Sequence, residues 1–214
     1  MSSLRRTALP ILALAAAVLV AGCGGGSSSE GTTTAATTTT TTTEASGSAS
    51  ERPPLDPAKT YTATMKTSEG TFSFTLDVKN SPNTTASFAS LVKKGFYDGL
   101  TFHRIVPDFV IQGGDPNGDG TGGPGYTVVD TPPSDAKYTK GVVAMAKTGA
   151  EPPGTSGSQF FVVTGADAGL PPDYAILGKV TDGLDVVEKI GQLGDASEQP
   201  TKKITIDKVT IAES

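Results

Sequence analysis

Hydrophobic and polar residues alternate, or apolar residues form short runs, along most of the chain after residue 57. Tyr61 to Lys66 and Thr71 to Asp77 show this pattern on either side of Ser68-Glu69-Gly70, which predicts a β-hairpin. The pattern therefore favours a domain built mainly from β-strands. Further strands are predicted at Thr101 to Val106, Phe109 to Gln112, Gly141 to Ala146, Phe160 to Thr164, Ala175 to Val180 and Ile204 to Ile211.

Two segments have helical spacing instead. The first runs from Asn83, with Ser or Asn available as a cap, to a stop at Gly95, and the second lies between Asp182 and Gly194. About eight strands and two helices without regular alternation fit a closed eight-stranded antiparallel β-barrel capped by two α-helices, because closure removes exposed strand edges. The apolar residues at helical spacing are Phe88, Leu91 and Val92 in the first segment, and Leu184, Val187, Ile190 and Leu193 in the second.

The start of the chain has the layout of a bacterial export signal. Arg5 and Arg6 precede an apolar run from Ile11 to Ala21, which is too short to span a bilayer as a helix. Cys23, the only cysteine, follows the small residues at the end of this run, and the ending resembles the lipobox of bacterial lipoproteins. We therefore expect residues 1–22 to be a lipoprotein signal peptide. Cys23 would carry a lipid anchor that holds the protein outside the cytoplasmic membrane, at the cell surface or in the periplasm.

Residues 23–57 are expected to form a disordered tether. They contain almost no large apolar side chains, and ten of the twelve residues from Thr32 to Thr43 are threonine. Such a segment cannot bury enough surface to offset the entropy of ordering it. A plain spacer is favoured over a stalk that carries sugars. Residues 58–214 have the length of one compact domain.

The balance of charges excludes some classes of function. The formal net charge of −5 falls to −7 when the signal peptide is removed with its two arginines. Because no basic patch is present, we expect no nucleic-acid binding. One cysteine at the expected anchor and one histidine, His103, leave no ligand set for a conventional zinc site. The protein is expected to be a monomer.

Several short motifs fail when their context is considered. Residues 115–120, DPNGDG, match the opening of a calcium-binding loop, but the glutamate required at the twelfth position is replaced by Tyr126. The glycines between residues 118 and 123 have the spacing of a dinucleotide-binding loop, yet no helix is predicted after them. His103 is the only histidine that could act as the base of a hydrolase, and the chain has no nucleophile elbow. For residues 118–123, a glycine-rich turn is the favoured interpretation.

Four separated motifs occur in the order and approximate spacing of the cyclophilins. The chain therefore resembles a cyclophilin-type peptidyl-prolyl cis-trans isomerase from about Tyr61 to Ile211. The fold that this resemblance implies, an eight-stranded barrel with two helices, agrees with the pattern above. It also implies an enzyme that needs no covalent intermediate, metal or cofactor. The motifs are FHRIVPDFVIQGGD at 102–115, GTGG at 120–123, MA at 145–146 and SGSQFF at 156–161.

The reaction that the resemblance implies is rotation about the peptide bond before proline. This bond has a barrier of about 18–20 kcal/mol, so uncatalysed exchange is slow. In the twisted transition state the prolyl nitrogen loses conjugation and gains a basic lone pair. A fixed donor aimed at this nitrogen binds the twisted form better than either planar form. By resemblance Arg104 is the donor, and its planar guanidinium can also hold the substrate carbonyl.

The other site residues follow from the same resemblance. Gln112 would support Arg104 and bond the substrate backbone, while the main chain around Ala146 and Lys147 would align an extended peptide. His103 is interpreted as a structural neighbour that orients its strand, not as a proton carrier. The proline ring would lie in an apolar pocket formed by Phe109, Val110, Phe161 and Leu170, with Tyr174 on its wall.

Three positions depart from the common cyclophilin pattern. Gly169 stands where many members have a tryptophan, Tyr174 stands where many have a histidine, and Lys147 replaces a common asparagine. We expect isomerase activity on proline-containing polypeptides to be retained. Inhibition by cyclosporin is expected to be weak, since the tryptophan of other members helps to hold that ligand.

Two other functions remain open at this point. The same groove could serve a binding or chaperone module that holds proline-containing segments with little turnover, or the chain could be a solute-binding lipoprotein with a barrel cavity. Arg104 favours the enzyme, because binding alone needs no transition-state donor, and a solute-binding protein gives no reason for the four motifs. The expected function is prolyl isomerisation that assists folding or conformational switching of proteins outside the cytoplasm.

Overall fold

The computed structural model describes residues 52–214. The predicted signal peptide, Cys23 and most of the predicted tether lie outside the described residues. Residues 52–57 form neither helix nor strand, and Leu55 packs against the main hydrophobic core. Within residues 52–214, every helix is too short or too polar to cross a membrane.

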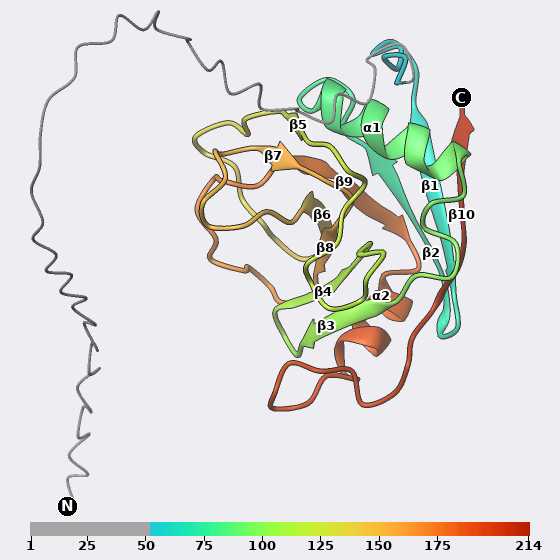
Figure 1. Ribbon diagram of the computed structural model, residues 1–214, viewed down its shortest axis with the longest axis vertical. Coiled ribbons are helices and arrows are strands. Elements are labelled where there is room, and N and C mark those ends of the chain that lie inside the picture. Colours follow the sequence, from blue (N-terminus) through green and yellow to red (C-terminus); the bar gives the residue numbers. More distant parts are fainter. Residues whose placement is uncertain (1–51) are drawn as a thin grey trace, which may run out of the picture. The chain divides into compact units, whose positions relative to one another are not determined.

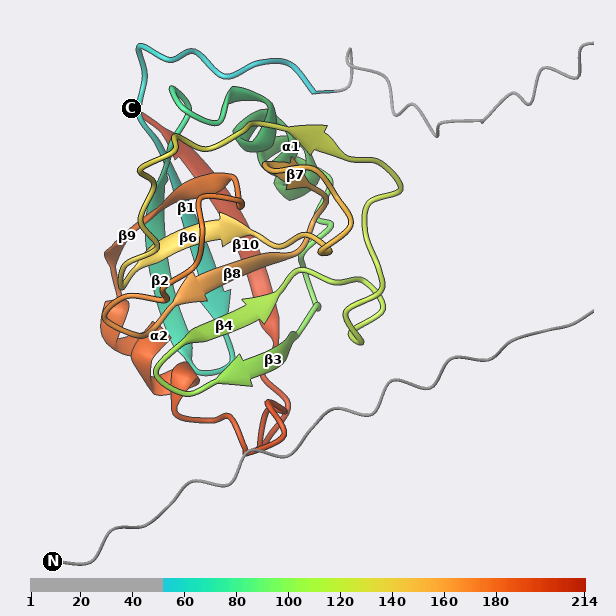
Figure 2. The ribbon, with the colours of Figure 1, turned by 90° about the vertical axis from the view of Figure 1, so that its left-hand side faces the viewer.

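Eight strands form one antiparallel sheet in the order β10-β1-β2-β9-β6-β8-β4-β3, which Figure 2 shows from the side of β6, β8, β4 and β3. All eight predicted strands are confirmed, each with ends within two residues of the expected ones. The strands are β1 (Tyr61–Thr67), β2 (Gly70–Leu76), β3 (Phe102–Val106), β4 (Val110–Gly113), β6 (Val142–Met145), β8 (Phe160–Val163), β9 (Ile176–Asp182) and β10 (Ile206–Glu213).

The sheet curls, but its strand ladder does not close into a full barrel. The two edge strands, β3 and β10, share no ladder, and the segments before them meet at one isolated bridge between Thr101 and Thr205. Two backbone hydrogen bonds beside the bridge join Phe102 N to Ile204 O and Ile206 N to Leu100 O, at 3.1 and 2.8 Å. A third backbone bond, from Gly99 N to Ile206 O at 2.7 Å, extends this contact, but the two edge strands still form no ladder with each other. The predicted closed barrel is therefore corrected to a curled, open sheet.

The two predicted helices, α1 (Pro82–Lys93) and α2 (Leu184–Gly191), lie at opposite ends of the curled sheet (Figures 1 and 2). Helix α1 ends as predicted, with Gly95 in a left-handed conformation (φ 67°). Its start differs, because the N-cap residue Ser81 makes no capping bond with its side chain. Asp130, from a distant loop, instead accepts hydrogen bonds from the Thr84 N–H and the Asn83 side chain, at 2.6 and 2.9 Å.

A second, two-stranded sheet was not predicted. β5 (Val128–Val129) pairs with β7 (Thr155–Ser156), close to α1 in both views (Figures 1 and 2). Each strand has two residues, which is too short to show a period in the sequence. Together the two strands hold the ends of the long loops that follow β4 and β6.

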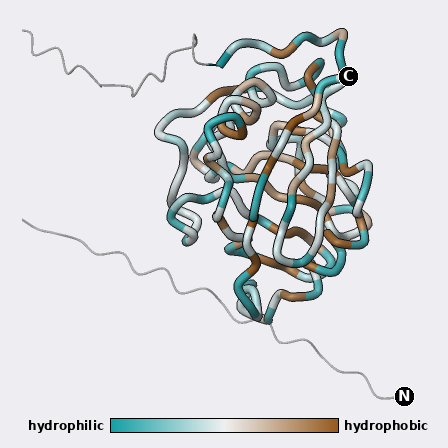
Figure 3. Tube along the Cα trace, turned by 90° about the vertical axis from the view of Figure 1, so that its right-hand side faces the viewer, coloured by the Kyte–Doolittle hydropathy of each residue, from teal (hydrophilic) through white to brown (hydrophobic). Residues whose placement is uncertain are grey.

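Apolar side chains form two clusters on opposite faces of the sheet. Ile105, Ile111 and Val162 belong to the main cluster inside the curl, whereas Val110 and Val163 belong to a smaller cluster on the outside. This alternation follows from strand geometry, since successive side chains point to opposite faces. Hydrophobic colouring runs along the strands in Figure 3, and hydrophilic colouring marks many of the loops. The apolar run from 102 to 111 therefore supplies side chains to both faces of the sheet.

Candidate active site

Three of the predicted site residues lie in one row across neighbouring strands. Arg104 lies opposite Gln112, Gln112 opposite Phe161, and Phe161 opposite Ala144, along β3, β4, β8 and β6. Directly paired residues of antiparallel strands project to the same face. Phe161 and Ala144 belong to the outer cluster. The row therefore places the guanidinium of Arg104 on the outer face of the sheet, beside apolar side chains.

A β-bulge turns Arg104 to this face. Phe102 and Ile105 both point into the main core, which regular alternation forbids for residues three apart. The register of β3 against β4 shifts between Phe102 and Arg104, and His103 is the extra residue. Such a bulge re-aims the side chains that follow it. The bulge explains how an arginine within an apolar strand avoids the core.

His103, next to Arg104, has a partly buried side chain. Both of its ring nitrogens are buried and have no hydrogen-bond partner among the described residues. Burial is the main cause that lowers the pKa of His103, the positive charge of Arg104 lowers it further, and Asp115 and Asp119 oppose the change. The neutral imidazole is therefore favoured.

Hydrogen bonds hold the guanidinium of Arg104 from two sides. Its Nε donates to Glu198 Oε2 at 2.7 Å, and Nη1 donates to Gln112 Oε1 at 3.3 Å. Gln112 Nε2 donates in turn to Gln159 Oε1 at 3.1 Å, and Gln159 Nε2 donates to two glycine carbonyls of the loop after β4. The Arg104 side chain is 34 % exposed. It is oriented by neighbours and still open to a ligand.

The predicted pocket residues gather in the outer cluster. Val110 and Phe161 are buried, and Phe109, Leu170 and Tyr174 pack against them while partly exposed. The rings of Phe161 and Tyr174 are 5.5 Å apart and almost perpendicular. These side chains pack into one apolar cluster on the same face of the sheet as Arg104 and Gln112.

Tyr138, a residue without a predicted role, fixes the Tyr174 wall. Its hydroxyl donates to the main-chain carbonyl of Tyr174 at 2.7 Å and accepts from the N–H of the same residue at 3.0 Å. The two rings meet edge to face at 5.9 Å. Burial raises the pKa of the Tyr138 hydroxyl, which stays protonated and able to donate.

The turn that carries Phe109 lies against the chain segment that follows β8, and it requires a glycine there. Asp108 has a φ of 57°, and the carbonyl of Phe109 accepts from Thr164 N at 2.9 Å. A Cβ on Gly165 would lie 2.1 Å from the Asp108 carbonyl oxygen. The close approach is therefore possible only for glycine, and it holds Phe109 at the edge of the outer cluster.

A groove of about 1020 Å³ borders Gln112 and shares only Ala146 with the outer apolar cluster. Gln112, Ala146 and Lys147, all predicted site residues, border it together with Gln159 and the glycine-rich loop. Phe109, Phe161 and the other pocket residues are not part of its lining. The predicted residues thus divide into a polar groove and an apolar patch, with Gln112, the partner of Arg104, bordering the groove.

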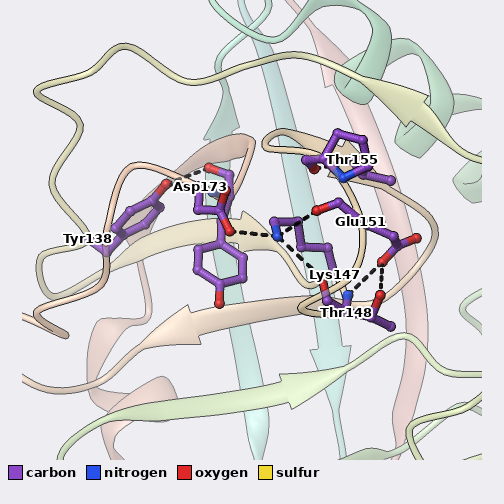
Figure 4. Close-up of polar contacts among 8 residues, drawn as sticks. Tyr138, Lys147, Thr148, Glu151, Thr155 and Asp173 are labelled. Atoms are coloured by element: carbon purple, nitrogen blue, oxygen red, sulfur yellow. Dashed lines mark hydrogen bonds and ion pairs between the residues drawn. The ribbon is translucent and has the colours of Figure 1, made fainter.

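Lys147 is unusual because its charged side chain is only 3 % exposed. Its Nζ lies 2.6 Å from Asp173 Oδ2 and donates to the carbonyls of Glu151 and Thr148 at 3.1 and 3.3 Å, as Figure 4 shows. Asp173 immediately precedes Tyr174. The lysine therefore joins the loop after β6, on the groove side, to the segment that carries the pocket wall.

Sequence reasoning assigned no role to four residues that hold this site together. Gln159 lies within the SGSQFF motif, next to two residues of β8, so its position was available as a signal. Tyr138, Asp173 and Glu198 lie in loops with no periodic pattern. Their roles depend on contacts between segments that are distant along the chain.

The fold and this geometry define a class of protein. An oriented and accessible arginine, between a polar groove and an apolar cluster on the outside of a curled β-sheet with two helices, suits the binding of an extended peptide with an apolar ring.

Comparisons with known proteins identify the family. The model of the family "Cyclophilin type peptidyl-prolyl cis-trans isomerase/CLD" matches residues 62–211. A peptidyl-prolyl cis-trans isomerase of Helicobacter pylori is 41 % identical over 144 residues, which cover 66 % of this chain and 86 % of that protein. Peptidyl-prolyl cis-trans isomerase B of Bacillus subtilis is 42 % identical over 127 residues, or 59 % of this chain and 86 % of that one.

Solved structures agree with these relatives. The crystal structure of a cyclophilin type peptidyl-prolyl cis-trans isomerase from Cryptosporidium parvum has a TM-score of 0.66 and 32 % identity, and it covers 72 % of this chain and 98 % of that one. A structure of that protein in the presence of the dipeptide Ala-Pro has a TM-score of 0.65. The chain therefore belongs to the cyclophilin-type peptidyl-prolyl cis-trans isomerases, which are enzymes.

Proposed function

We propose that Arg104 is the catalytic residue of this isomerase and that it stabilises the twisted prolyl bond. The proline ring would rest on the outer cluster, against Phe109, Phe161 and Leu170. The guanidinium of Arg104, on β3, would donate to the prolyl nitrogen as the lone pair of this nitrogen develops. It would also donate to the carbonyl that precedes the proline. No bond to the enzyme forms, because the reaction is a rotation.

One observation carries this proposal. The guanidinium of Arg104 is 34 % exposed, is bonded to Gln112 at 3.3 Å, and stands in the same cross-strand row as Phe161 of the apolar cluster. A donor that is already oriented stabilises the transition state without reorganisation during the reaction.

The peptide would be aligned along the main chain after β6. The Ala146 N–H already donates to Gln159 O at 2.9 Å, so in this proposal the Ala146 carbonyl and the Lys147 main chain take that role. The Lys147 side chain is committed to Asp173 and two carbonyls. The departure from asparagine at this position thus leaves the proposed backbone role intact.

The proposed place of action is outside the cytoplasm. The signal-like residues 1–22, the cysteine at 23 and the threonine-rich segment after it support an exported, lipid-anchored protein. Its substrates would be proline-containing segments of unfolded or flexible proteins, whose folding or switching waits for a slow prolyl bond.

An isomerisation assay on a short prolyl peptide tests the catalytic proposal. Arg104→Ala is expected to lower kcat/KM by about 10²-fold or more. Arg104→Lys should recover little, because an ammonium lacks the planar fork. Unfolding curves should show that both variants are folded. An active, folded Arg104→Ala variant would contradict the proposal, and peptide binding without acceleration by the wild type would favour the binding module.

A further inference from the structure

Glu198 belongs to a tightly closed loop between α2 and β10. Asp195 Oδ1 accepts hydrogen bonds from Ser197 N and Gln199 N, at 2.8 and 3.0 Å, and the Glu198 N–H donates to Asp195 O at 3.0 Å. Glu198 has a φ of 64°, a left-handed conformation that residues with a side chain rarely adopt. The loop therefore fixes the backbone of Glu198 in one conformation.

The same residue is bound twice to strand β3. Its carbonyl accepts from Ile105 N at 2.9 Å, and its carboxylate accepts from Nε of the preceding residue, Arg104, at 2.7 Å. The loop can come this close because a Cβ on Gly194 would lie 2.4 Å from the Ile105 carbonyl oxygen. The carboxylate of Glu198 is thus held in a fixed position relative to the backbone of the strand that carries Arg104.

We infer that Glu198 is a positioning residue for Arg104, and this inference rests on the catalytic role proposed above. The guanidinium presents a planar fork of N–H donors. Glu198 occupies its Nε end and Gln112 one of its Nη groups, which fixes the plane while the other donors serve the substrate. Without Glu198 the arginine would have to be ordered in each catalytic cycle, at a cost to the rate.

A second ion pair in the molecule provides a matched control. Lys140 Nζ and Glu188 Oε1 also lie 2.7 Å apart, and their side chains are 41 and 45 % exposed, against 34 and 49 % for Arg104 and Glu198. Exposed pairs of this kind contribute little to stability. Glu198 and Glu188 should therefore affect folding equally little, and only Glu198 should affect the reaction.

The experiment compares Glu198→Ala, Glu198→Gln and Glu188→Ala in the full chain, with kcat and KM measured separately on one prolyl peptide. Glu198→Ala is expected to lower kcat about three- to tenfold with KM changed less than about twofold. Glu198→Gln keeps a hydrogen-bond acceptor and should recover part of the loss. Glu188→Ala should match the wild type.

A spectroscopic measurement follows the arginine itself. Arg104 is the only arginine after Arg52, and disappearance of its Nε–H resonance in Arg104→Lys assigns the signal. The exchange of this proton with water should be slow in the wild type and in Glu188→Ala, and clearly faster in Glu198→Ala.

Several outcomes would overturn the inference. An unchanged kcat in Glu198→Ala, with Arg104→Ala inactive, would remove the role of Glu198 and leave the proposed function intact. An increased kcat would show that Glu198 competes with the substrate for the guanidinium. A loss of kcat matched by a loss of folding stability would show a merely structural role. Full activity of folded Arg104→Ala would overturn both proposals.

Discussion

At the scale of single residues, Arg104 shows how a charge can occupy an apolar strand. A guanidinium in the main core would need full compensation for its lost hydration. The bulge at His103 sends it instead to the outer face, where it keeps contact with water and with Glu198. The strand can therefore carry an arginine at little cost to stability.

His103 provides a prediction on the pH dependence of stability. Because burial lowers its pKa in the folded state, the unfolded chain binds a proton more readily below about pH 6.5. The free energy of unfolding should therefore fall as the pH drops below this value, until the lowered pKa of the folded state is reached. Denaturant titrations between pH 7.5 and 5 measure the slope.

The control for this prediction is His103→Phe, which removes the only histidine of the chain. Over the same range its stability should depend less on pH than that of the wild type. Equal slopes in the two proteins would contradict the assignment of the effect to His103.

Gly169 leads to a prediction on ligand binding. It has a φ of 63°, and a Cβ at this position would have no atom of the described residues within 4 Å. The pocket edge before Leu170 is therefore open where many cyclophilins have a tryptophan. Cyclosporin should inhibit the isomerase only weakly in a dose–response assay, and low-nanomolar inhibition would contradict this expectation.

At the scale of elements, Lys147 links two loops of the site through a buried charge. Lys147→Met would leave Asp173 and the carbonyls of Glu151 and Thr148 without their partner. We expect a loss of about 1–3 kcal/mol in the free energy of unfolding, and a raised KM because the wall at Tyr174 is released.

A lysine in an exposed pair supplies the control. Lys140→Met breaks only the contact with Glu188 and should change stability by less than about 0.5 kcal/mol. Equal losses in the two variants, measured by urea denaturation, would show that burial of Lys147 has no energetic consequence.

The elements that could be predicted are those that show a period or a short apolar run. All ten strands and helices of four or more residues in the described part of the chain carry one of these signals, although β6 and β8 are buried along their whole length. β5 and β7 are too short for this signal, and the true cap of α1, Asp130, lies 46 residues from Thr84. The contact between the segments that precede β3 and β10 depends on how two loops bend, which no local pattern encodes.

The candidate site was predictable to the extent that it lies on these strands. Arg104, Gln112 and Phe161 fall in motifs of regular elements, so their alignment in one row follows from strand pairing. Glu198, Tyr138 and Asp173 come from loops, and their contacts form only when the whole sheet has curled. Sequence reasoning therefore identified the proposed catalytic group and missed the residues that hold it in place.

At the scale of the whole molecule, the proposed anchor has a direct test. In a bacterial host that processes lipoproteins, the protein should incorporate labelled palmitate and sediment with membranes. Cys23→Ala should lose the label and appear in the soluble extracytoplasmic fraction with its isomerase activity unchanged. Incorporation of palmitate by Cys23→Ala, or a wild type free of lipid, would contradict the anchor.

The central claim is that Arg104 acts on the twisted bond more than on the bound peptide. NMR on one prolyl peptide can report its affinity and its cis-trans exchange rate in the same sample, with wild type and with Arg104→Ala. We predict that exchange slows by about 10²–10³-fold while the affinity changes far less. Equal proportional losses of affinity and exchange rate, or an unchanged exchange rate in the folded variant, would contradict it.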